Sequence, residues 1–438
     1  MWSIFHPKHP VYRVRPIAPS ELPGILRRNI WTGVLGALAI NFLTGGVFFT
    51  AYCLNMGMND KWFGLLYTLT APMVVFTMLA GVLEERFGHR KYPFFILALA
   101  SRLALGPMLL GAILAVPPWA VVAMVVAFAA LSNLSTPLWL SWTWSYIPAD
   151  RFARFSAVRS SWATLVQMPV ALAGAFAVES VPPRHRTLVF CAIFSLLIVA
   201  GVVDLVCHIH IPEPPREDAP EKSVSRIREV LRNAPMRNLL LATMIWNFGV
   251  MVGGPFCLPY MMAELGYRDR IMSAALLTSV LPSLATLAAL WAWGRLLDRT
   301  STGPILTVSY ALWATIPLFY YFAPPDSPDT AMMLVWLVGG IAPWGAVLAT
   351  PLLLARLSGR DKTMPAALWL ITSSLGSMVG SALGTWIVAN FGGSRPAFMV
   401  SFAARAAAAC IVFLLVVCEP WARRRGAAAR GPAPADAA

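Results

Sequence analysis

The chain has 438 residues, of which 58% are hydrophobic and only 12% are charged, and its mean hydropathy is +0.67. Soluble globular chains carry about 25% charged residues, so a fold surrounded by water could not hide this much apolar surface. The formal net charge is +14. No basic stretch is interleaved with base-stacking aromatic residues, so we expect no nucleic-acid partner and interpret the excess of cations as membrane-protein loop charge.

A helix needs about 20 predominantly apolar residues to cross the hydrocarbon core of a bilayer. The hydrophobic pattern predicts an all-α polytopic membrane protein with twelve such helices. In chain order, the predicted spans cover residues 30–56, 62–83, 92–115, 119–147, 161–179, 188–211, 238–262, 271–294, 303–323, 331–355, 365–390 and 396–418.

The distribution of Lys and Arg predicts the orientation of these spans. With both termini in the cytoplasm, 26 of the 34 Lys and Arg residues fall in cytoplasmic segments, including Arg151, Arg154 and Arg159, and six fall in outer loops. Cytoplasmic loops carry such an excess of cations. We therefore expect a multi-pass protein of the inner (plasma) membrane, with the lipid bilayer as its surroundings.

One long cytoplasmic connection, residues 212–237, separates six predicted spans from six others. It starts with several prolines and continues with Val224, Ile227, Val230 and Leu231 at helical spacing, which indicates a short amphipathic helix on the membrane surface. The predicted units are a six-helix bundle with a cytoplasmic tail over 1–211, a linker over 212–237, and a second bundle with a tail over 238–438.

A charged motif follows the second span and returns in weaker form after the eighth. The first copy contains the following residues: Gly81, Glu85, Arg86, Gly88, Arg90 and Lys91. The second copy keeps Gly294, Asp298 and Arg299, and Ser301 replaces its later glycine. Asn41 and Asn247, each followed by a pair of glycines, also hold corresponding places in the two halves. These matches indicate a duplicated chain.

The twelve spans, the central linker and this motif resemble the major facilitator superfamily of secondary transporters. The resemblance implies a fold of two pseudo-symmetric six-helix bundles and transport by alternating access. It also implies that Glu85 and its neighbours form a conformational latch with the start of the eleventh span and with Arg151 or Arg154. A carboxylate contact of this kind, made in one conformation and broken in the other, biases a two-state equilibrium.

Three ionisable residues lie within predicted spans: Arg102, Asp204 and Arg405. A charge at membrane depth is costly and needs a specific reason. Arg102 either pairs with Asp204, or serves an anionic substrate or proton coupling. Asp204 and His208, four residues apart, share a helix face, which indicates the interfacial end of a helix rather than a metal site. The six cysteines show no CxxC spacing, so we expect no metal and no cofactor.

Uncharged polar residues are the candidates for substrate binding, because the resemblance implies that spans one, four, seven and ten line a central cavity. The candidates are Asn41, Asn133, Trp139, Gln167, Asn247 and Trp344. Hydrogen bonding between helices is their alternative role. A cavity of this composition favours a neutral or amphiphilic small molecule, carried with or without a coupling ion. An Arg102 or Arg405 facing the cavity would favour an anion instead.

Two other functions remain open from the sequence: a multi-span membrane enzyme, and a transporter-like scaffold or sensor. An enzyme would need convergent His, Asp, Glu or Cys residues near one interface, and no catalytic motif is present. We expect a monomeric transporter rather than an enzyme. The glycines Gly376, Gly380 and Gly384, four residues apart, predict a close-packing ridge on span eleven, directed toward a span of the other half.

Overall fold

The computed structural model describes residue 12 and residues 14–414, except for 115, 148, 216–226 and 358–362. These residues are almost entirely helical, and twelve helical segments are long and apolar enough to cross a membrane, which confirms the predicted number of spans. The connection between the halves contributes the short helix α9 (Ile227–Arg232).

The first half contains eight α-helices, and three 3₁₀ segments join or precede some of them. The α-helices are α1 (Leu22–Leu43), α2 (Gly46–Asn55), α3 (Asp60–Thr70), α4 (Ala80–Phe87), α5 (Lys91–Ala104), α6 (Pro118–Trp144), α7 (Ala149–Glu179) and α8 (Arg186–Ile209). The 3₁₀ segments are η3 (Ala71–Leu79), η4 (Gly106–Ala112) and η5 (Pro183–His185). η3 begins with Ala71-Pro72 and η4 begins with Gly106-Pro107. Because proline has no backbone N–H, it interrupts the α-helical hydrogen bonds at these points.

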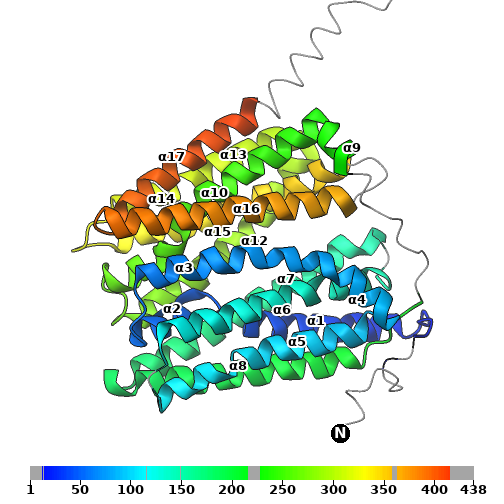
Figure 1. Ribbon diagram of the computed structural model, residues 1–438, viewed down its shortest axis with the longest axis horizontal. Coiled ribbons are helices and arrows are strands. Elements are labelled where there is room, and N and C mark those ends of the chain that lie inside the picture. Colours follow the sequence, from blue (N-terminus) through cyan, green and yellow to red (C-terminus); the bar gives the residue numbers. More distant parts are fainter. Residues whose placement is uncertain are drawn as a thin grey trace, which may run out of the picture.

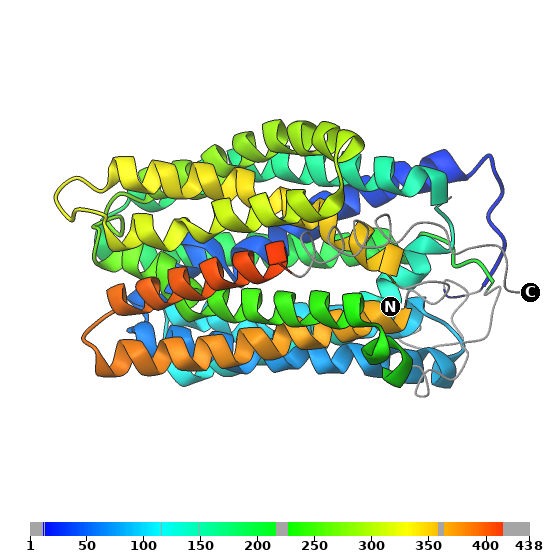
Figure 2. The same ribbon diagram turned by 90° about the horizontal axis from the view of Figure 1, so that it is seen from above.

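The second half has the same number of spans with different interruptions. Its elements are α10 (Ala234–Ala263), α11 (Ile271–Ala275), the π-helical turn η7 (Leu276–Val280), α12 (Leu281–Arg299), α13 (Thr302–Ala314), α14 (Ile316–Tyr321), α15 (Asp329–Leu357), α16 (Thr363–Asn390) and α17 (Arg395–Val412). Figure 1 shows α1 to α8 gathered on one side and α10 to α17 on the other, with their axes roughly parallel. The view from above shows the same alignment (Figure 2).

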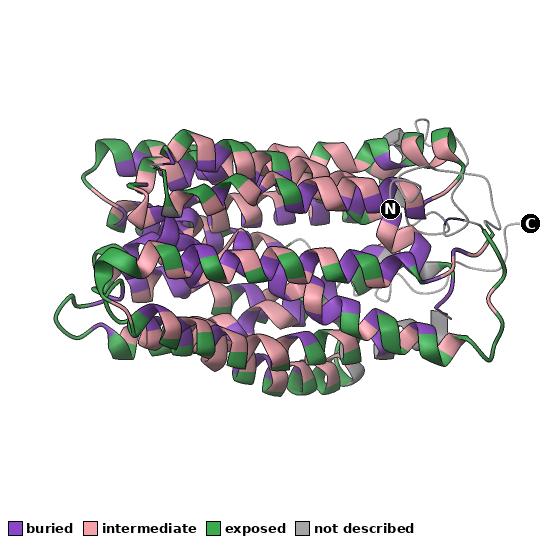
Figure 3. Cartoon of the chain, turned by 90° about the horizontal axis from the view of Figure 1, so that it is seen from below, coloured by how far each residue is buried: buried purple, intermediate pink, exposed green. Residues whose placement is uncertain are grey.

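Burial follows the membrane pattern rather than the pattern of a soluble protein. Buried residues gather between the helices, and exposed residues cover the outer flanks (Figure 3). Many of the exposed residues are large and apolar, among them Leu196, which is 71% exposed in the middle of α8, and Phe176, which is 66% exposed in α7. Because such residues would be unfavourable in water, the outer flanks are suited to contact lipid.

The glycine ridge of α16 packs within its own half, so the predicted direction of this ridge is wrong. A Cβ added at Gly376, Gly380 or Gly384 would overlap with the backbone oxygens of Met244, Phe248 and Val252 in α10. Helical periodicity identified a close-packing face but could not identify its partner. The contact of α16 with the first half uses another face, on which the Ser381 hydroxyl donates to the Gly64 carbonyl of α3 at 3.0 Å.

We predict that Gly380→Ala destabilises the protein, because its methyl group would have to displace the backbone of α10. Overpacking of this kind costs about 1–3 kcal/mol. The matched control is Gly339→Ala in α15, whose added Cβ would meet only Ile316 Cδ1 at an ordinary 3.7 Å. Thermal unfolding of both variants in detergent measures the effect. Equal melting temperatures for the two variants would contradict the close approach of α16 and α10.

Candidate functional site

A cavity of about 320 Å³ lies between the two halves, and we call it the central cavity. The first half contributes residues from α1, α2 and α7, and the second half contributes residues from α10, η7, α12 and α15. Its lining consists of Asn41, Phe42, Gly46, Val47, Phe48, Gln167, Leu258, Thr278, Ser279, Ser283 and Trp336. None of these residues is charged, and most of the polar ones carry hydroxyl or amide groups. The cavity can therefore form hydrogen bonds without providing a charge.

Two breaks in helix geometry shape this cavity, one from each half. Between α1 and α2 the chain leaves the helix at Gly45, and Gly46 has φ of +72°, a left-handed conformation that favours glycine. In the second half, η7 places Thr278 and Ser279 on the cavity wall. Discontinuous spans and π-helical turns free backbone groups and redirect side chains, and both are frequent at functional sites.

The polar groups of the central cavity are only partly satisfied. The Asn41 amide donates to Gln167 Oε1 at 2.9 Å, which joins α1 to α7. The Thr278 hydroxyl and the Trp336 indole nitrogen are buried and have no hydrogen-bond partner among the described residues. A buried polar group without a hydrogen bond is unfavourable, so each of these two is available to a bound molecule.

Three of the six predicted binding residues line a cavity, and three do not. Asn41 and Gln167 line the central cavity, and Asn41 also lines a second cavity, described below, together with Trp139. Asn133, Asn247 and Trp344 line neither. Asn247 donates to Thr243 O in its own helix, and Trp344 Nε1 donates to Thr286 Oγ1. Sequence reasoning missed Thr278, Ser279, Ser283 and Trp336, although the polar run around Pro282 was a usable signal for the first three.

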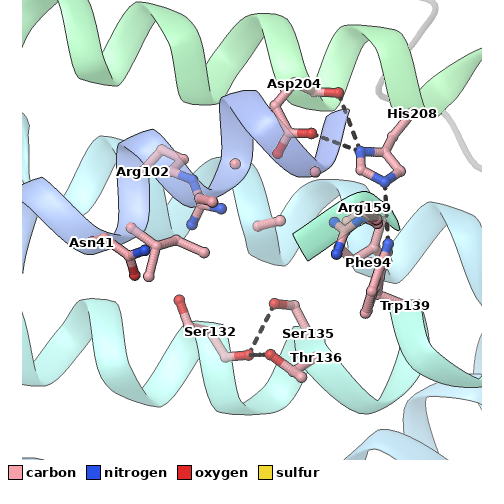
Figure 4. A pocket seen from close by; sticks show the side chains of 15 residues that line it. Asn41, Phe94, Arg102, Ser132, Ser135, Thr136, Trp139, Arg159, Asp204 and His208 are labelled. Atoms are coloured by element: carbon pink, nitrogen blue, oxygen red, sulfur yellow. Dashed lines mark hydrogen bonds and ion pairs between the residues drawn. The ribbon is translucent and has the colours of Figure 1, made fainter. Parts of the chain in front are cut away.

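The second cavity, of about 340 Å³, lies inside the first half, and we call it the N-half cavity (Figure 4). Its polar lining comes from five spans. These polar and charged residues are Asn41, Arg102, Ser132, Ser135, Thr136, Trp139, Arg159, Asp204 and His208. Its apolar lining includes Ile40, Phe94 and Ala98. The cavity thus combines charged groups with an apolar wall at membrane depth.

His208 is held from both sides of its ring in this cavity. The Trp139 indole N–H, which can only donate, points to His208 Nε2 at 3.1 Å, and Thr32 Oγ1 lies 3.2 Å from the same nitrogen. His208 Nδ1 is 2.9 Å from Asp204 Oδ1. Asp204 and Trp139 therefore fix the orientation of the ring (Figure 4).

Arg159 lies in α7 within the fifth span and lines the N-half cavity, which corrects its assignment to a cytoplasmic loop. The guanidinium stacks over Trp139 at 4.8 Å and its Nε donates to Asn29 O at 3.3 Å. Gly33 makes this possible, because an added Cβ there would overlap with the Arg159 side chain. The basic run after span four was read as a loop, whereas α7 already begins at Ala149.

The two arginines inside spans have different surroundings. Arg405, 3% exposed, donates to the carbonyls of Gly249, Val250 and Trp313. Arg102 lines the N-half cavity, and its one hydrogen bond to a described residue is to Ser101 Oγ at 3.1 Å. Among the described residues Arg102 forms no ion pair, so the pairing with Asp204 is not present as a direct contact. Asp204 instead accepts from His208, one helical turn further along α8.

The motif after the second span adopts the geometry that its glycine requires. Gly88 ends α4 with φ of +66°, and its N–H donates to Glu84 O. Glu85 and Arg86 are exposed, and Glu85 bonds to no described residue. The side chains of Arg151, Arg154 and Asp298 lie outside the described part of the chain. In the second copy, Gly294 has open space around it and Arg299 is exposed.

Arg90, by contrast, is buried and bound within the first half. Glu213, at the start of the linker, accepts from the backbone N–H and the Nε of Arg90 at 2.8 and 3.1 Å, and from the Lys91 N–H at 3.2 Å. Arg90 also donates to Pro214 O and Ser141 O. The carboxylate satisfies the open N-terminus of α5 and ties the linker to it.

The hydrogen bonds between described residues of the two halves lie at the end of the bundle away from this motif. Asp60 bonds to Ser394 and Asn55 to Arg268, with distances of 2.7 and 2.8 Å. Arg186 pairs with Asp269 at 2.9 Å. Glu179 accepts from the Met272 N–H, and Thr68 donates to Ser381. The halves are therefore fastened at one end of the spans.

We predict that Glu213→Ala lowers the melting temperature substantially, because the buried Arg90 loses the carboxylate to which it is hydrogen-bonded at 3.1 Å and keeps only Glu84, at 3.9 Å. Breaking a buried pair costs about 3–5 kcal/mol. The control is Glu21→Ala, which removes the exposed Arg15–Glu21 pair and should cost at most about 1 kcal/mol. Thermal unfolding in detergent compares the two variants. A Glu213→Ala protein as stable as the control would show that this junction does not hold the first half together.

Comparison with known proteins gives a family but no close relative. The sequence matches the Major Facilitator Superfamily over residues 30–326 and 254–437. No curated protein matches it.

Several solved structures share the fold. They include the nucleoside transporter NupG (TM-score 0.64, 12% identity, 90% of this chain and 98% of that one) and the inward-open xylose transporter XylE from E. coli (0.66, 14%, 90% and 96%). A bacterial homologue of the human lysosomal transporter Spinster, inward-facing and unoccupied, has a TM-score of 0.57 at 16% identity, with 92% and 96% coverage. The fold, the twelve spans and the match over most of the sequence together show that the chain belongs to the major facilitator superfamily.

Proposed function

We propose that this protein is a secondary transporter that moves a small molecule across the membrane by alternating access of its two halves. The observation that carries the proposal is the central cavity, which both halves line at the breaks in their helices. Transporter sites form at such repeat interfaces near mid-membrane. A transporter needs no catalytic group there, and an uncharged, hydrogen-bonding lining suits binding and release.

The contacts between the halves support an assignment of the conformation. Hydrogen bonds between described residues join the halves only at the end away from the latch motif, and Glu85 is free of described partners. The excess of Lys and Arg in one set of connecting segments supports a cytoplasmic position for the latch motif, the charged segment of residues 81–91. The structure then corresponds to a state closed toward the outside, and the Glu85 latch would form when the outer contacts break.

The lining of the central cavity favours an uncharged, polar part of a substrate. Asn41 and Gln167 offer amide groups, and Thr278 and Trp336 have unsatisfied hydrogen-bonding groups. Two proteins of similar fold are a xylose–proton symporter and a nucleoside transporter, whose solutes are rich in hydroxyl groups. A neutral or amphiphilic solute with hydroxyl or amide groups fits this lining best.

We predict that loss of either cavity amide weakens binding of the substrate. A screen of sugars, nucleosides, amino acids and carboxylates by the melting temperature of the purified protein first identifies a solute that binds. Asn41→Ala and Gln167→Ala should each weaken its affinity about fivefold, as expected for a hydrogen bond worth about 1 kcal/mol.

Asn390→Ala is the matched control, because the Asn390 amide bonds only to Trp386 O at the end of its own helix. Calorimetric titration measures the three affinities. If the Asn41 and Gln167 variants bind the solute as tightly as the Asn390 variant, the central cavity is not the binding site.

We also predict that fixing the halves at their outer contact stops transport. Thr68 Oγ1 and Ser381 Oγ are 3.1 Å apart on short side chains, so cysteines at these two positions can form a disulfide. The oxidised Thr68→Cys, Ser381→Cys double variant in proteoliposomes should lose uptake of the identified solute and regain it on reduction. Each single variant should be insensitive to oxidation. Full uptake by the crosslinked protein would contradict alternating access.

A further inference from the structure

The charges that line the N-half cavity do not balance. Two arginines, Arg102 and Arg159, line this cavity with a single carboxylate, that of Asp204. One positive charge is left over in a cavity at membrane depth. Uncompensated charge is costly in this environment, so an additional anion would be strongly favoured there.

Arg102 carries this excess charge. Arg159 has Asn29 O and the Trp139 ring as partners, and Asp204 is engaged by His208. Arg102 is only 6% exposed and lies 5.7 Å from the Phe128 ring, yet among the described residues its hydrogen bonds are limited to Ser101 Oγ, and its Nε is buried without a hydrogen-bond partner. Arg405 is the structural counterpart for comparison. It donates to three backbone carbonyls and lines neither cavity.

A second unsatisfied group belongs to the same cavity. The Ser132 hydroxyl in α6 is buried, has no hydrogen-bond partner in the described part of the chain, and lines the N-half cavity across from Arg102 (Figure 4). A guanidinium and a hydroxyl on facing walls are both donors that an oxyanion can accept from. Guanidinium groups bind carboxylates and phosphates with charge-assisted hydrogen bonds.

We propose that the N-half cavity binds the carboxylate of a small organic monoanion, with Arg102 and Ser132 as its donors. One carboxylate neutralises the single excess charge. Ile40, Phe94 and Ala98 form an apolar wall that suits an aliphatic or aromatic body and would leave inorganic phosphate or chloride poorly matched. The volume of about 340 Å³ is within the range of small-molecule sites.

Asn41 places this site beside the transport route. Its side chain lines both cavities, so a ligand held by Arg102 can extend toward Gln167 in the central cavity. The inference deepens the proposed function by narrowing its amphiphilic solute to one with a carboxylate, and only the placement of the ligand on the route rests on that function. Binding of the carboxylate itself requires no movement of the halves.

The test measures binding of benzoate to the purified full chain by calorimetry, with neutral benzamide and inorganic phosphate as comparison probes. Benzoate should bind, whereas benzamide and phosphate should bind at least about thirtyfold more weakly. Benzamide lacks the charge that pairs with Arg102, and loss of one partner of a buried charge pair costs about 2 kcal/mol or more, which is about a thirtyfold loss of affinity. Equal binding of benzoate and benzamide would overturn the proposal without the need for any variant.

Three variants assign the donors. Arg102→Gln should weaken benzoate at least about thirtyfold and Ser132→Ala about fivefold, whereas Arg295→Gln, on the exposed stack with Trp291, should bind as the parent does. Without ligand, Arg102→Gln should melt no lower than the parent, because it removes an uncompensated charge. Arg405→Gln should melt lower, because three carbonyls lose their donor. Unchanged benzoate affinity in Arg102→Gln, or melting of this variant as low as that of Arg405→Gln, would overturn the proposal.

The outcome separates the site from the transport function. Benzoate binding in a protein that transports nothing would support the site and overturn the proposed function. Transport of a screened solute by a protein that does not bind benzoate would overturn the site and leave the function standing.

Discussion

Inside the hydrocarbon core a polar group has no water to bond with, so it must be satisfied by the protein or lie against a cavity. The fold follows this constraint closely. Arg405 is surrounded by backbone carbonyls. Among the described residues, buried side-chain atoms without a partner occur on the walls of the two cavities, at Arg102, Ser132, Thr278 and Trp336, and also away from them, for example at Tyr320 and Trp369.

The same constraint connects the architecture with movement. The close packing of α16 on α10 makes the second half a unit, and the junction of Glu213 with α5 ties the linker to the first. The contacts between the halves combine hydrogen bonds at one end with apolar packing, since Phe48 and Tyr52 of the first half belong to the same buried cluster as Phe256 and Tyr260 of the second half. A cavity with unsatisfied donors at the boundary is then stabilised by whatever molecule it holds, and the two halves can respond to that molecule as units.

The sequence was sufficient for the features that depend on composition. The twelve spans follow from apolar length. The predictions that were wrong concerned which residues contact one another in the fold. Arg159 was assigned to a loop because periodicity does not reveal that a basic run is already helical. Pairing of Arg102 with Asp204 was one of two roles that the sequence left open, and among the described residues Asp204 bonds to His208 on its own helix. The π-helical turn that exposes Thr278 has no signature in composition.

Distances between spin labels at the two ends of the bundle test the movement of the halves most directly. One pair of labels, on the exposed Arg86 and Arg299, reports the latch end, and another, on Lys61 and Phe391, reports the outer end. The account predicts a short, narrow outer distance without ligand. When a transported solute is present, it predicts a second population with a longer outer distance and a shorter latch-end distance. Distances that stay fixed at both ends while transport proceeds would contradict it.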